Sequence, residues 1–156
     1  MVDGVTVRQA TVADAHDLVR LRRMMFEAMG FDDPVQLNAS DATTAAYFAE
    51  AIPAETFRGW LAVTPTGAVI GSGGVVIDQH PPGPGNLSGR VGYIMSLVTV
   101  PGYRRRGIAR RIMQTMLRWL EEQGIQCMAL HATEMGRPLY RDLGFLDSNE
   151  MKMRLE

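Results

Sequence analysis

The residues most suited to chemistry form one arginine-rich segment, VTVPGYRRRGIARR at positions 98–111. An apolar stretch runs into Pro101, three consecutive arginines follow, and Gly107 precedes an amphipathic pattern. Arginine side chains suit bidentate contacts with phosphate. The N-terminus of the helix expected after Gly107 would add free backbone N–H groups, which commonly bind phosphate, and the glycine lets the backbone approach closely. The segment therefore predicts an anion-binding site.

The charge pattern around this helix start is unfavourable unless an anion binds there. No acidic residue occurs from Pro101 to Leu120. A helix N-terminus already carries about half a positive charge, so each exposed cation near it typically costs roughly 0.3–1 kcal/mol. The five cations are Arg104, Arg105, Arg106, Arg110 and Arg111. Charge alone leaves open a second interpretation, a solvated basic helix end that binds acidic protein or RNA.

Two nucleotide-binding motifs are excluded by the neighbouring residues. Gly102 and Gly107 have the spacing of a P-loop, but Ile108 and Ala109 stand where that motif needs Lys and Ser or Thr. The dinucleotide pattern is also absent, because the glycines at positions 71–74 lack the last glycine and a following helix. A magnesium-nucleotide site and a dinucleotide site are therefore not expected.

Two motifs together resemble those of the GCN5-related N-acetyltransferase (GNAT) superfamily. Residues 104–109, RRRGIA, resemble its Q/R-x-x-G-x-G/A motif, and residues 139–145, LYRDLGF, resemble its L-Y-x-x-x-G-F motif. The order of the expected elements matches that fold over nearly the whole chain. The resemblance implies a GNAT fold, a mixed but mostly antiparallel sheet flanked by helices and splayed between its two central strands.

The resemblance also implies which residues bind acetyl-CoA. The pantetheine arm would pair with the strand at Leu97, Val98 and Thr99. The pyrophosphate would lie on the loop and helix start, with contacts from Arg104, Arg105, Arg106, Gly107, Ile108, Ala109 and Arg110. Thr133 stands where many members carry an asparagine that contacts the cofactor. The tyrosine near the thioester sulfur corresponds to Tyr140, which could protonate the leaving thiolate as general acid.

The activity implied is transfer of an acetyl group from acetyl-CoA to a primary amine of a small-molecule or peptide acceptor by direct attack. Backbone N–H groups of the strand at Leu97 could stabilise the developing oxyanion. No metal is expected, because the three histidines are scattered. One alternative is a non-catalytic acetyl-CoA-binding regulatory module, and another is a basic-helix interaction protein. The acceptor is not specified, because fold and cofactor site do not fix it.

Three residues are candidates for the acceptor side of the site and for the general base. Glu27 lies late in the first expected helix, a region that often lines the acceptor site in this superfamily. His131 ends the strand before the second motif, and Asp78 lies with His80 in a Pro- and Gly-rich loop. Each residue also has an ordinary explanation, as a solvated helix residue, a hydrogen-bonded strand-end histidine or loop residues.

The elements that must position these residues follow from hydrophobic periodicity and turn signals. The first helix starts near Thr11 or Asp14, and a loop over residues 31–37 separates it from a second helix that starts at Ser40 or Asp41 and ends before Pro53. Strands are expected at 5–8, 60–63, 68–77, 91–100, 125–131 and 151–155, and further helices at 108–123 and 135–143. This order predicts an α/β or α+β domain with a mixed sheet.

Length and composition bound the remaining possibilities. The 156 residues predict a single domain over positions 1–156. A net charge of −1 argues against a nucleic-acid binder. The lone Cys127 favours a reducing compartment, and without a secretory signal or a long apolar stretch we expect a cytoplasmic protein with no membrane partner. A homodimer is common in the superfamily, and the C-terminal strand could pair across it.

Overall fold

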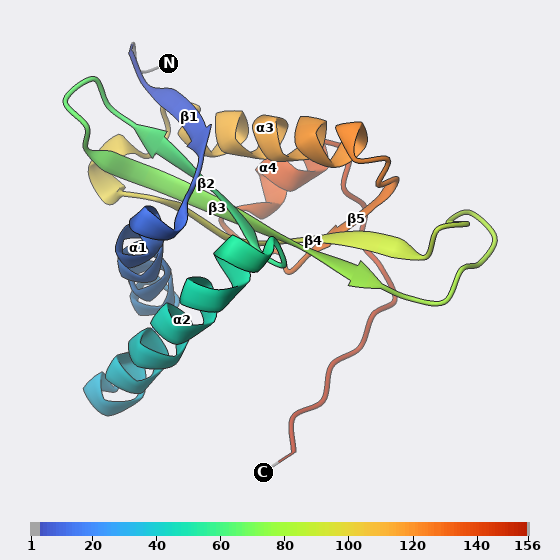
Figure 1. Cartoon of the computed structure of the whole chain (residues 1–156), viewed down its shortest axis with the longest axis horizontal. Coiled ribbons are helices and arrows are strands. Elements are labelled where there is room, and N and C mark those ends of the chain that lie inside the picture. The colour runs from blue at the N-terminus through green and yellow to red at the C-terminus, as the bar shows by residue number, and fades with distance from the viewer. Residues whose placement is uncertain (1–3, 156) are drawn as a thin grey trace.

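The computed structural model describes residues 4–155, which form a five-stranded sheet in the order β1-β2-β3-β4-β5 (Figure 1). The strands are β1 (Thr6–Gln9), β2 (Arg58–Val63), β3 (Val69–Gln79), β4 (Arg90–Thr99) and β5 (Cys127–Leu130). The α-helices are α1 (Ala15–Ala28), α2 (Pro34–Ala54), α3 (Ile108–Glu122) and α4 (Arg137–Asp142). Two short 3-10 turns, η1 (Val12–Asp14) and η2 (Pro101–Tyr103), precede α1 and α3.

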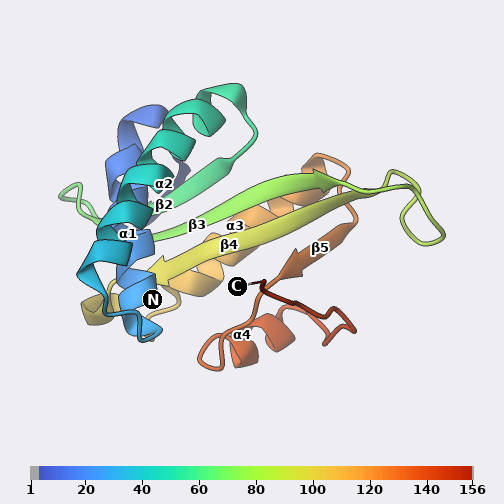
Figure 2. The same cartoon turned by 90° about the horizontal axis from the view of Figure 1, so that it is seen from below.

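The sheet opens between its last two strands. Neighbours from β1 to β4 are antiparallel, whereas β5 runs parallel to β4. The pairing of β4 with β5 extends only from Val91–Cys127 to Ile94–Leu130, and β4 then continues to Thr99 paired with β3 only. Helices α1 and α2 cover one face of the sheet and α3 the other (Figure 2). These features confirm the predicted α/β fold with a mostly antiparallel, splayed sheet.

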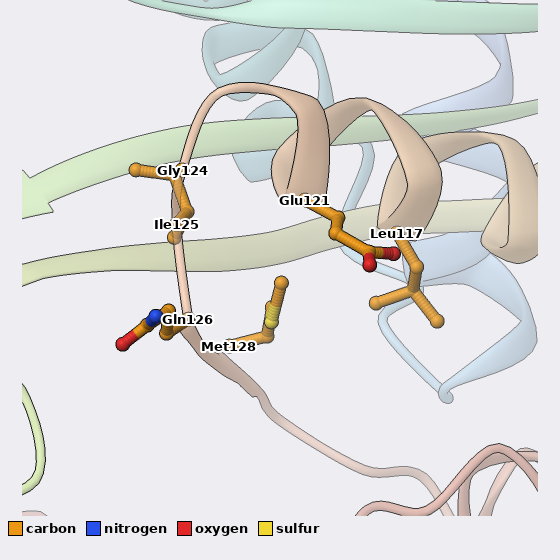
Figure 3. A pocket seen from close by; sticks show the side chains of 6 residues that line it. All are labelled: Leu117, Glu121, Gly124, Ile125, Gln126 and Met128. Atoms are coloured by element: carbon orange, nitrogen blue, oxygen red, sulfur yellow. The ribbon is translucent and has the colours of Figure 1, made fainter.

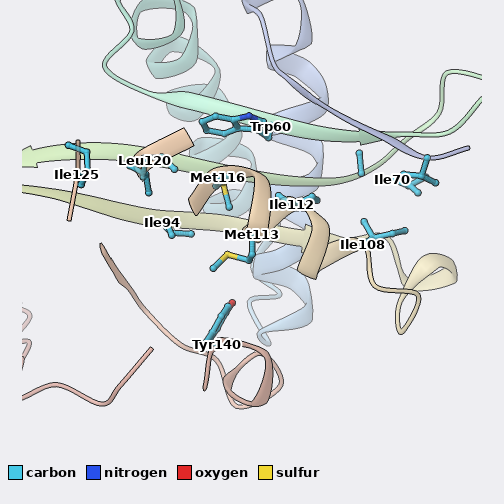
Figure 4. Close-up of a cluster of buried hydrophobic side chains, with 13 residues drawn as sticks. Trp60, Ile70, Ile94, Ile108, Ile112, Met113, Met116, Leu120, Ile125 and Tyr140 are labelled. Atoms are coloured by element: carbon cyan, nitrogen blue, oxygen red, sulfur yellow. The ribbon is translucent and has the colours of Figure 1, made fainter. Parts of the chain in front are cut away.

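Helix α3 packs closely because the strands beneath it carry glycines. A Cβ on Gly73 would lie 2.7 Å from Cε of Met116, and a Cβ on Gly92 would lie 2.7 Å from Cδ2 of Leu120. The glycines that weaken the strand pattern in the sequence are therefore sites of close approach. The buried face of α3, at Ile108, Ile112, Met113, Met116 and Leu120, forms the centre of the main hydrophobic cluster (Figure 4).

Helix α2 is longer than the sequence predicts at both ends. The loop predicted over residues 31–37 is too long. Residues 31–33 do lie outside the helices, but α2 begins at Pro34, and the Asp33 carboxylate accepts a hydrogen bond from the Val35 amide at 3.0 Å. Proline is well suited to the first helical position. The predicted end before Pro53 is also wrong. Burial of Phe48 and Ala51 in the last turns holds the helix through the proline.

The predicted strand over residues 151–155 is absent. This segment has no strand partner, and Met151 and Met153 are 94% and 81% exposed. Alternating apolar residues predict a strand only where a partner strand is available. Among the described residues nothing pairs with the outer edge of β5, and Figure 1 shows the C-terminal segment leading away from the sheet.

Within positions 4–155 no helix is both long enough and apolar enough to cross a bilayer.

Candidate functional site

The loop between β4 and α3 contains a run of unpaired backbone amides. The amides of Tyr103 and Arg104 donate to the carbonyls of Val100 and Pro101, and hydrogen bonding resumes when the Arg111 amide donates to the Gly107 carbonyl. The amides of the intervening residues, 105–110, donate to no acceptor in the part of the chain that the structure describes. Consecutive free N–H groups at a helix start make an anion-binding concavity.

The backbone of this loop is bent by two residues in the left-handed region. Arg105 has φ 63° and Gly107, at the start of α3, has φ 78°. A non-glycine residue in this conformation costs on the order of 1–3 kcal/mol, and such strain gathers at functional sites. Left-handed residues in turns bring neighbouring N–H groups to one side, as in known phosphate-binding nests. The bend therefore accounts for the unpaired amides.

The arginine side chains of the loop differ in what they contact. Arg104 donates from Nε to the Thr99 carbonyl at 3.2 Å, and Arg106 lies over the Tyr103 ring at 5.5 Å from its centroid. Arg110 lies 3.0 Å from the Asp142 carboxylate and so ties α3 to α4. Arg105, by contrast, has no side-chain partner among residues 4–155. The loop therefore offers two kinds of unused donor, the free backbone amides and the guanidinium N–H groups that have no partner.

The strand that enters the loop contains the residues predicted to hold the pantetheine arm. Val98 and Thr99 pair with Ser72 and Gly71 of β3, but β5 has already ended opposite Ile94. The edge of β4 over residues 95–99 therefore has no strand partner on the β5 side within the described chain. Because residues 97–99 lead directly to the loop, the structure brings the predicted strand and loop residues together.

Tyr140 lies on α4 and packs into the main cluster, where it is 8% exposed. Figure 4 shows its hydroxyl directed toward Met113 of α3. Burial raises the pKa of Tyr140 above its usual value of 10, so the phenol keeps its proton at neutral pH. Gly136 lies under the ring, since a Cβ there would lie 2.7 Å from Cε2 and 2.8 Å from the hydroxyl oxygen of Tyr140. Tyr140 is therefore a buried, protonated phenol whose position depends on Gly136.

Thr133 and His131 both follow β5 on the opening side of the sheet. The Thr133 hydroxyl accepts a hydrogen bond from the Gly136 amide at 3.1 Å, which closes the turn before α4, and its own proton remains available for donation. His131 is exposed and comes directly after Leu130, the last residue paired with β4. Both residues therefore lie where the two strands separate.

The contacts of Glu27 and Asp78 do not place either residue at this opening. Glu27 is 3.7 Å from Arg23, which also binds Asp41 at 2.7 Å, so this carboxylate belongs to a network between α1 and α2. Asp78 is in β3, so its predicted placement in a loop is wrong; it pairs with Val91. Seven residues separate Val91 from Val98 along β4, a distance of about 23 Å. The structure does not bring Asp78 to the predicted strand.

A hollow of about 300 Å³ lies on the face of the sheet that α1 and α2 cover, opposite α3. It lies between these two helices and the strands β3 and β4. It is lined by Arg22, Thr43, Thr44, Tyr47, Phe48, Phe57, Val76 and Met95. No motif in the sequence points to this group, whose members come from several elements. The one available signal was Arg22, a cation at helical spacing from the buried Leu18 and one residue after the buried Leu21.

A larger hollow, of about 440 Å³, lies at the opposite end of α3 (Figure 3). Leu117 and Glu121 border it from the helix, and Gly124, Ile125, Gln126 and Met128 border it from the segment that leads into β5. Helix α3 spans about 20 Å at 1.5 Å per residue, so this hollow is far from the loop with free amides. Size alone therefore does not identify the site.

Comparison with known proteins identifies relatives of this chain in sequence and in fold. A model of the acetyltransferase (GNAT) family matches residues 18–145. A GCN5-related N-acetyltransferase from Ralstonia eutropha is 30% identical with a TM-score of 0.89, over 97% of this chain and 99% of that one. A predicted acetyltransferase from Clostridium acetobutylicum, solved with acetyl-CoA, is 26% identical with a TM-score of 0.86, over 97% and 96% of the two chains.

A curated relative, glucosamine 6-phosphate N-acetyltransferase from Trypanosoma brucei brucei, is 29% identical over 92 residues. The match covers 59% of this chain and spans about 60% of the length of that relative. The family match, by contrast, reaches from α1 through α4 and includes both the loop and Tyr140. The chain therefore belongs to the acetyltransferase (GNAT) family.

Proposed function

We propose that the protein is an N-acetyltransferase that moves the acetyl group of acetyl-CoA to a primary amine of a small molecule or peptide. The observation that carries this proposal is the run of free amides at residues 105–110, placed directly after the unpaired edge of β4. The similar Clostridium acetobutylicum protein was solved with acetyl-CoA.

The cofactor fits the proposed site in two parts. The amides of residues 105–110 would hold the pyrophosphate, and the unpaired side chain of Arg105 could add charge to a phosphate. The pantetheine arm would extend along residues 97–99 and take the place that a further strand would have beside β4. This arrangement puts the thioester near the point where β4 and β5 separate.

The reaction needs two proton transfers. The neutral amine attacks the thioester carbon, a C–N bond forms, and the carbonyl oxygen gains negative charge that a strand N–H near Leu97 stabilises. As the C–S bond breaks, Tyr140 donates its proton to the thiolate. The amine proton leaves to a base or to water. Of the predicted candidates, His131 is the best placed, because it follows β5 at the opening.

Amine-dependent release of CoA tests the proposal. Purified protein is incubated with acetyl-CoA, with and without a panel of amines, and free thiol is measured. We expect thiol release only when a suitable amine is present. Binding of acetyl-CoA without amine-dependent release would instead support a regulatory module. A thermal-shift comparison checks the cofactor, because a ligand at about 100 times its Kd adds roughly 2.7 kcal/mol of stability, and ATP should give a smaller shift than CoA.

A further inference from the structure

The hollow on the α1 and α2 face adjoins an irregularity in β4. The register between β3 and β4 shifts around Gly74 and Ser72, and Ser96 has φ 56°. This bulge allows Met95 and Ser96, which are consecutive, both to contact the α1 and α2 side: Met95 packs in the second hydrophobic cluster and Ser96 contacts Arg22. These residues come directly after Ile94, the last residue that pairs with β5. The hollow therefore lies next to the start of the proposed thioester site.

Arg22 is the one charged side chain among the residues that line this hollow. Its Nη1 donates to the Ser96 hydroxyl at 2.6 Å, and its guanidinium lies over the Phe26 ring at 4.9 Å from the centroid. Burial lowers the pKa of Arg22, but the group stays charged. The structure thus holds a partly buried cation in a fixed position.

Arg22 differs from its neighbour Arg23 in what balances its charge. Arg23 contacts Asp41 at 2.7 Å and Glu27 at 3.7 Å. No carboxylate among residues 4–155 lies within ion-pair distance of Arg22. Withdrawing a cation from water without a counter-charge is unfavourable. A position of this kind is explained if a ligand supplies the negative charge.

The rest of the lining suits a small polar ligand with one anionic end. Thr44 and Tyr47 present hydroxyl groups that have no hydrogen-bond partner in the described chain, whereas the Thr43 hydroxyl is already bonded to helix carbonyls. Phe57 and Met95 form the apolar side. A volume of about 300 Å³ is at the lower end of small-ligand sites.

We propose that the acceptor amine carries an oxyanion, a phosphate or a carboxylate, and that Arg22 binds it with help from the hydroxyls of Thr44 and Tyr47. A guanidinium forms paired hydrogen bonds with such groups. The proposal rests on the proposed function, because it names the acceptor class of that site. A purely structural role for Arg22, holding α1 to β4 through Ser96, is the competing explanation.

The test compares matched amines at saturating acetyl-CoA, so that the loop amides are occupied. The pairs are ethanolamine with phosphoethanolamine, glucosamine with glucosamine 6-phosphate, and propylamine with β-alanine. Each is measured by CoA release and by the thermal shift it adds to the CoA-loaded protein. We expect kcat/KM or the thermal shift to favour the anionic member of at least one pair, and the phosphate and carboxylate pairs show which oxyanion fits.

Variants separate binding from structure. Arg22→Gln should lower kcat/KM for the anionic member roughly 10- to 100-fold more than for its neutral partner. Arg22→Lys should keep part of the preference. Ser96→Ala, which removes the tether but not the cation, should keep the preference, and so should Arg23→Gln, the matched control outside the hollow.

Two results would overturn the proposal: no anion preference in any pair by either readout, or a preference that survives Arg22→Gln. If Arg22 has only a structural role, Arg22→Gln and Ser96→Ala should lower the stability of the protein to a similar extent. Neither variant should then change the preference for the anionic amine. Failure of the proposed function is a separate result, absence of acetyl-CoA binding in the wild type. In that case the thermal shift with anionic amines is measured on the protein alone, and Arg22 is tested by whether Arg22→Gln removes that shift.

Discussion

The loop before α3 and the hollow under α1 and α2 both present hydrogen-bond donors suited to an anion. They differ in whether the backbone or the side chains supply these donors. In the loop the donors are backbone amides of one continuous segment, residues 105–110. In the hollow the donors are side chains, a guanidinium from α1 at Arg22 and hydroxyls from α2 at Thr44 and Tyr47. Our proposals assign the loop to acetyl-CoA, which is the same for every acceptor, and the hollow to the acceptor, whose recognition by side chains can change through single substitutions.

Tyr140 belongs to neither region, and its removal should give the largest effect. Tyr140→Phe removes the proposed proton donor and should lower kcat by about 100-fold or more. The KM values for acetyl-CoA and acceptor should change less than about twofold, because neither binding region is altered. Because burial raises the pKa of Tyr140 above 10, any loss of activity through its ionisation should occur only above pH 10 in the wild type.

Steady-state kinetics with Tyr93→Phe as a control checks this prediction. Tyr93 is on the paired part of β4, opposite Ala129, and has no proposed role in catalysis. An unchanged kcat in Tyr140→Phe would remove the acid role.

Gly107→Val tests whether the loop acts through its backbone. Gly107 has φ 78° and open space around it, so a β-branched residue meets no clash but costs about 1–2 kcal/mol in this conformation. We expect the Kd for acetyl-CoA to rise roughly 10-fold while the acceptor KM stays within about twofold. Gly102→Val is the matched control, because Gly102 is equally open and has no left-handed φ. Equal Kd values in the two variants would contradict the proposed role of the amides.

Gly136→Ala tests whether displacement of the Tyr140 ring lowers kcat even when the hydroxyl group is present. The added methyl group would lie 2.7 Å from Cε2 of the ring, so the ring must move. We expect kcat to fall roughly 3- to 10-fold, less than in Tyr140→Phe, because the hydroxyl is displaced and not removed. Gly83→Ala, where nothing lies within 4 Å of the new methyl group, is the control. A kcat at the wild-type value would show that the ring has room to adapt.

The smallest expected effect is on stability and concerns the ion pair of Arg8 and Asp14, which lies outside the loop and the hollow. The Asp14 carboxylate receives two hydrogen bonds of 2.9 Å from Arg8 and one of 2.8 Å from the Thr11 amide, and these hold the pKa of Asp14 at about 2. Because the folded-state pKa lies below the unfolded value, this stability is present above about pH 4 and is lost as the pH falls toward 2. Screening by solvent limits it to about 1 kcal/mol.

Urea unfolding of Asp14→Asn, followed from pH 7 to pH 3, measures this contribution. We expect the variant to be about 1 kcal/mol less stable at pH 7 and the difference to shrink at low pH. A constant difference across this range would contradict the assignment. Kinetics at pH 7 should not change, which separates a stabilising pair from the two binding regions.

The difference between the two regions also decides what the sequence could predict. The loop, the stripe of α3 and Tyr140 are each encoded in a short segment, so their spacing is visible in the sequence alone. The hollow is assembled from α1, α2, β3, β4 and Phe57, which lies in the turn before β2. Arg22 lies one residue after the buried Leu21, but only helix packing places it against Ser96.

Errors in the predicted elements have similar causes. Asp78 was assigned to a loop because prolines and glycines follow it, yet pairing with Val91 carries β3 through it. The strand expected over residues 151–155 failed for the opposite reason, since an alternating pattern has no effect without a partner. The local sequence pattern indicates which segments can form strands, and pairing with other strands decides which of them do.

An NMR titration of the ¹⁵N-labelled protein with acetyl-CoA tests the central claim most directly. It reports on the backbone amides themselves, in a chain of 17.2 kDa. We expect the largest shifts at residues 105–110, smaller ones along residues 97–99, and none at Gly124, Ile125 and Gln126 beside the larger hollow. Saturable binding that leaves the amides of residues 105–110 unmoved would contradict the claim that this loop holds the cofactor.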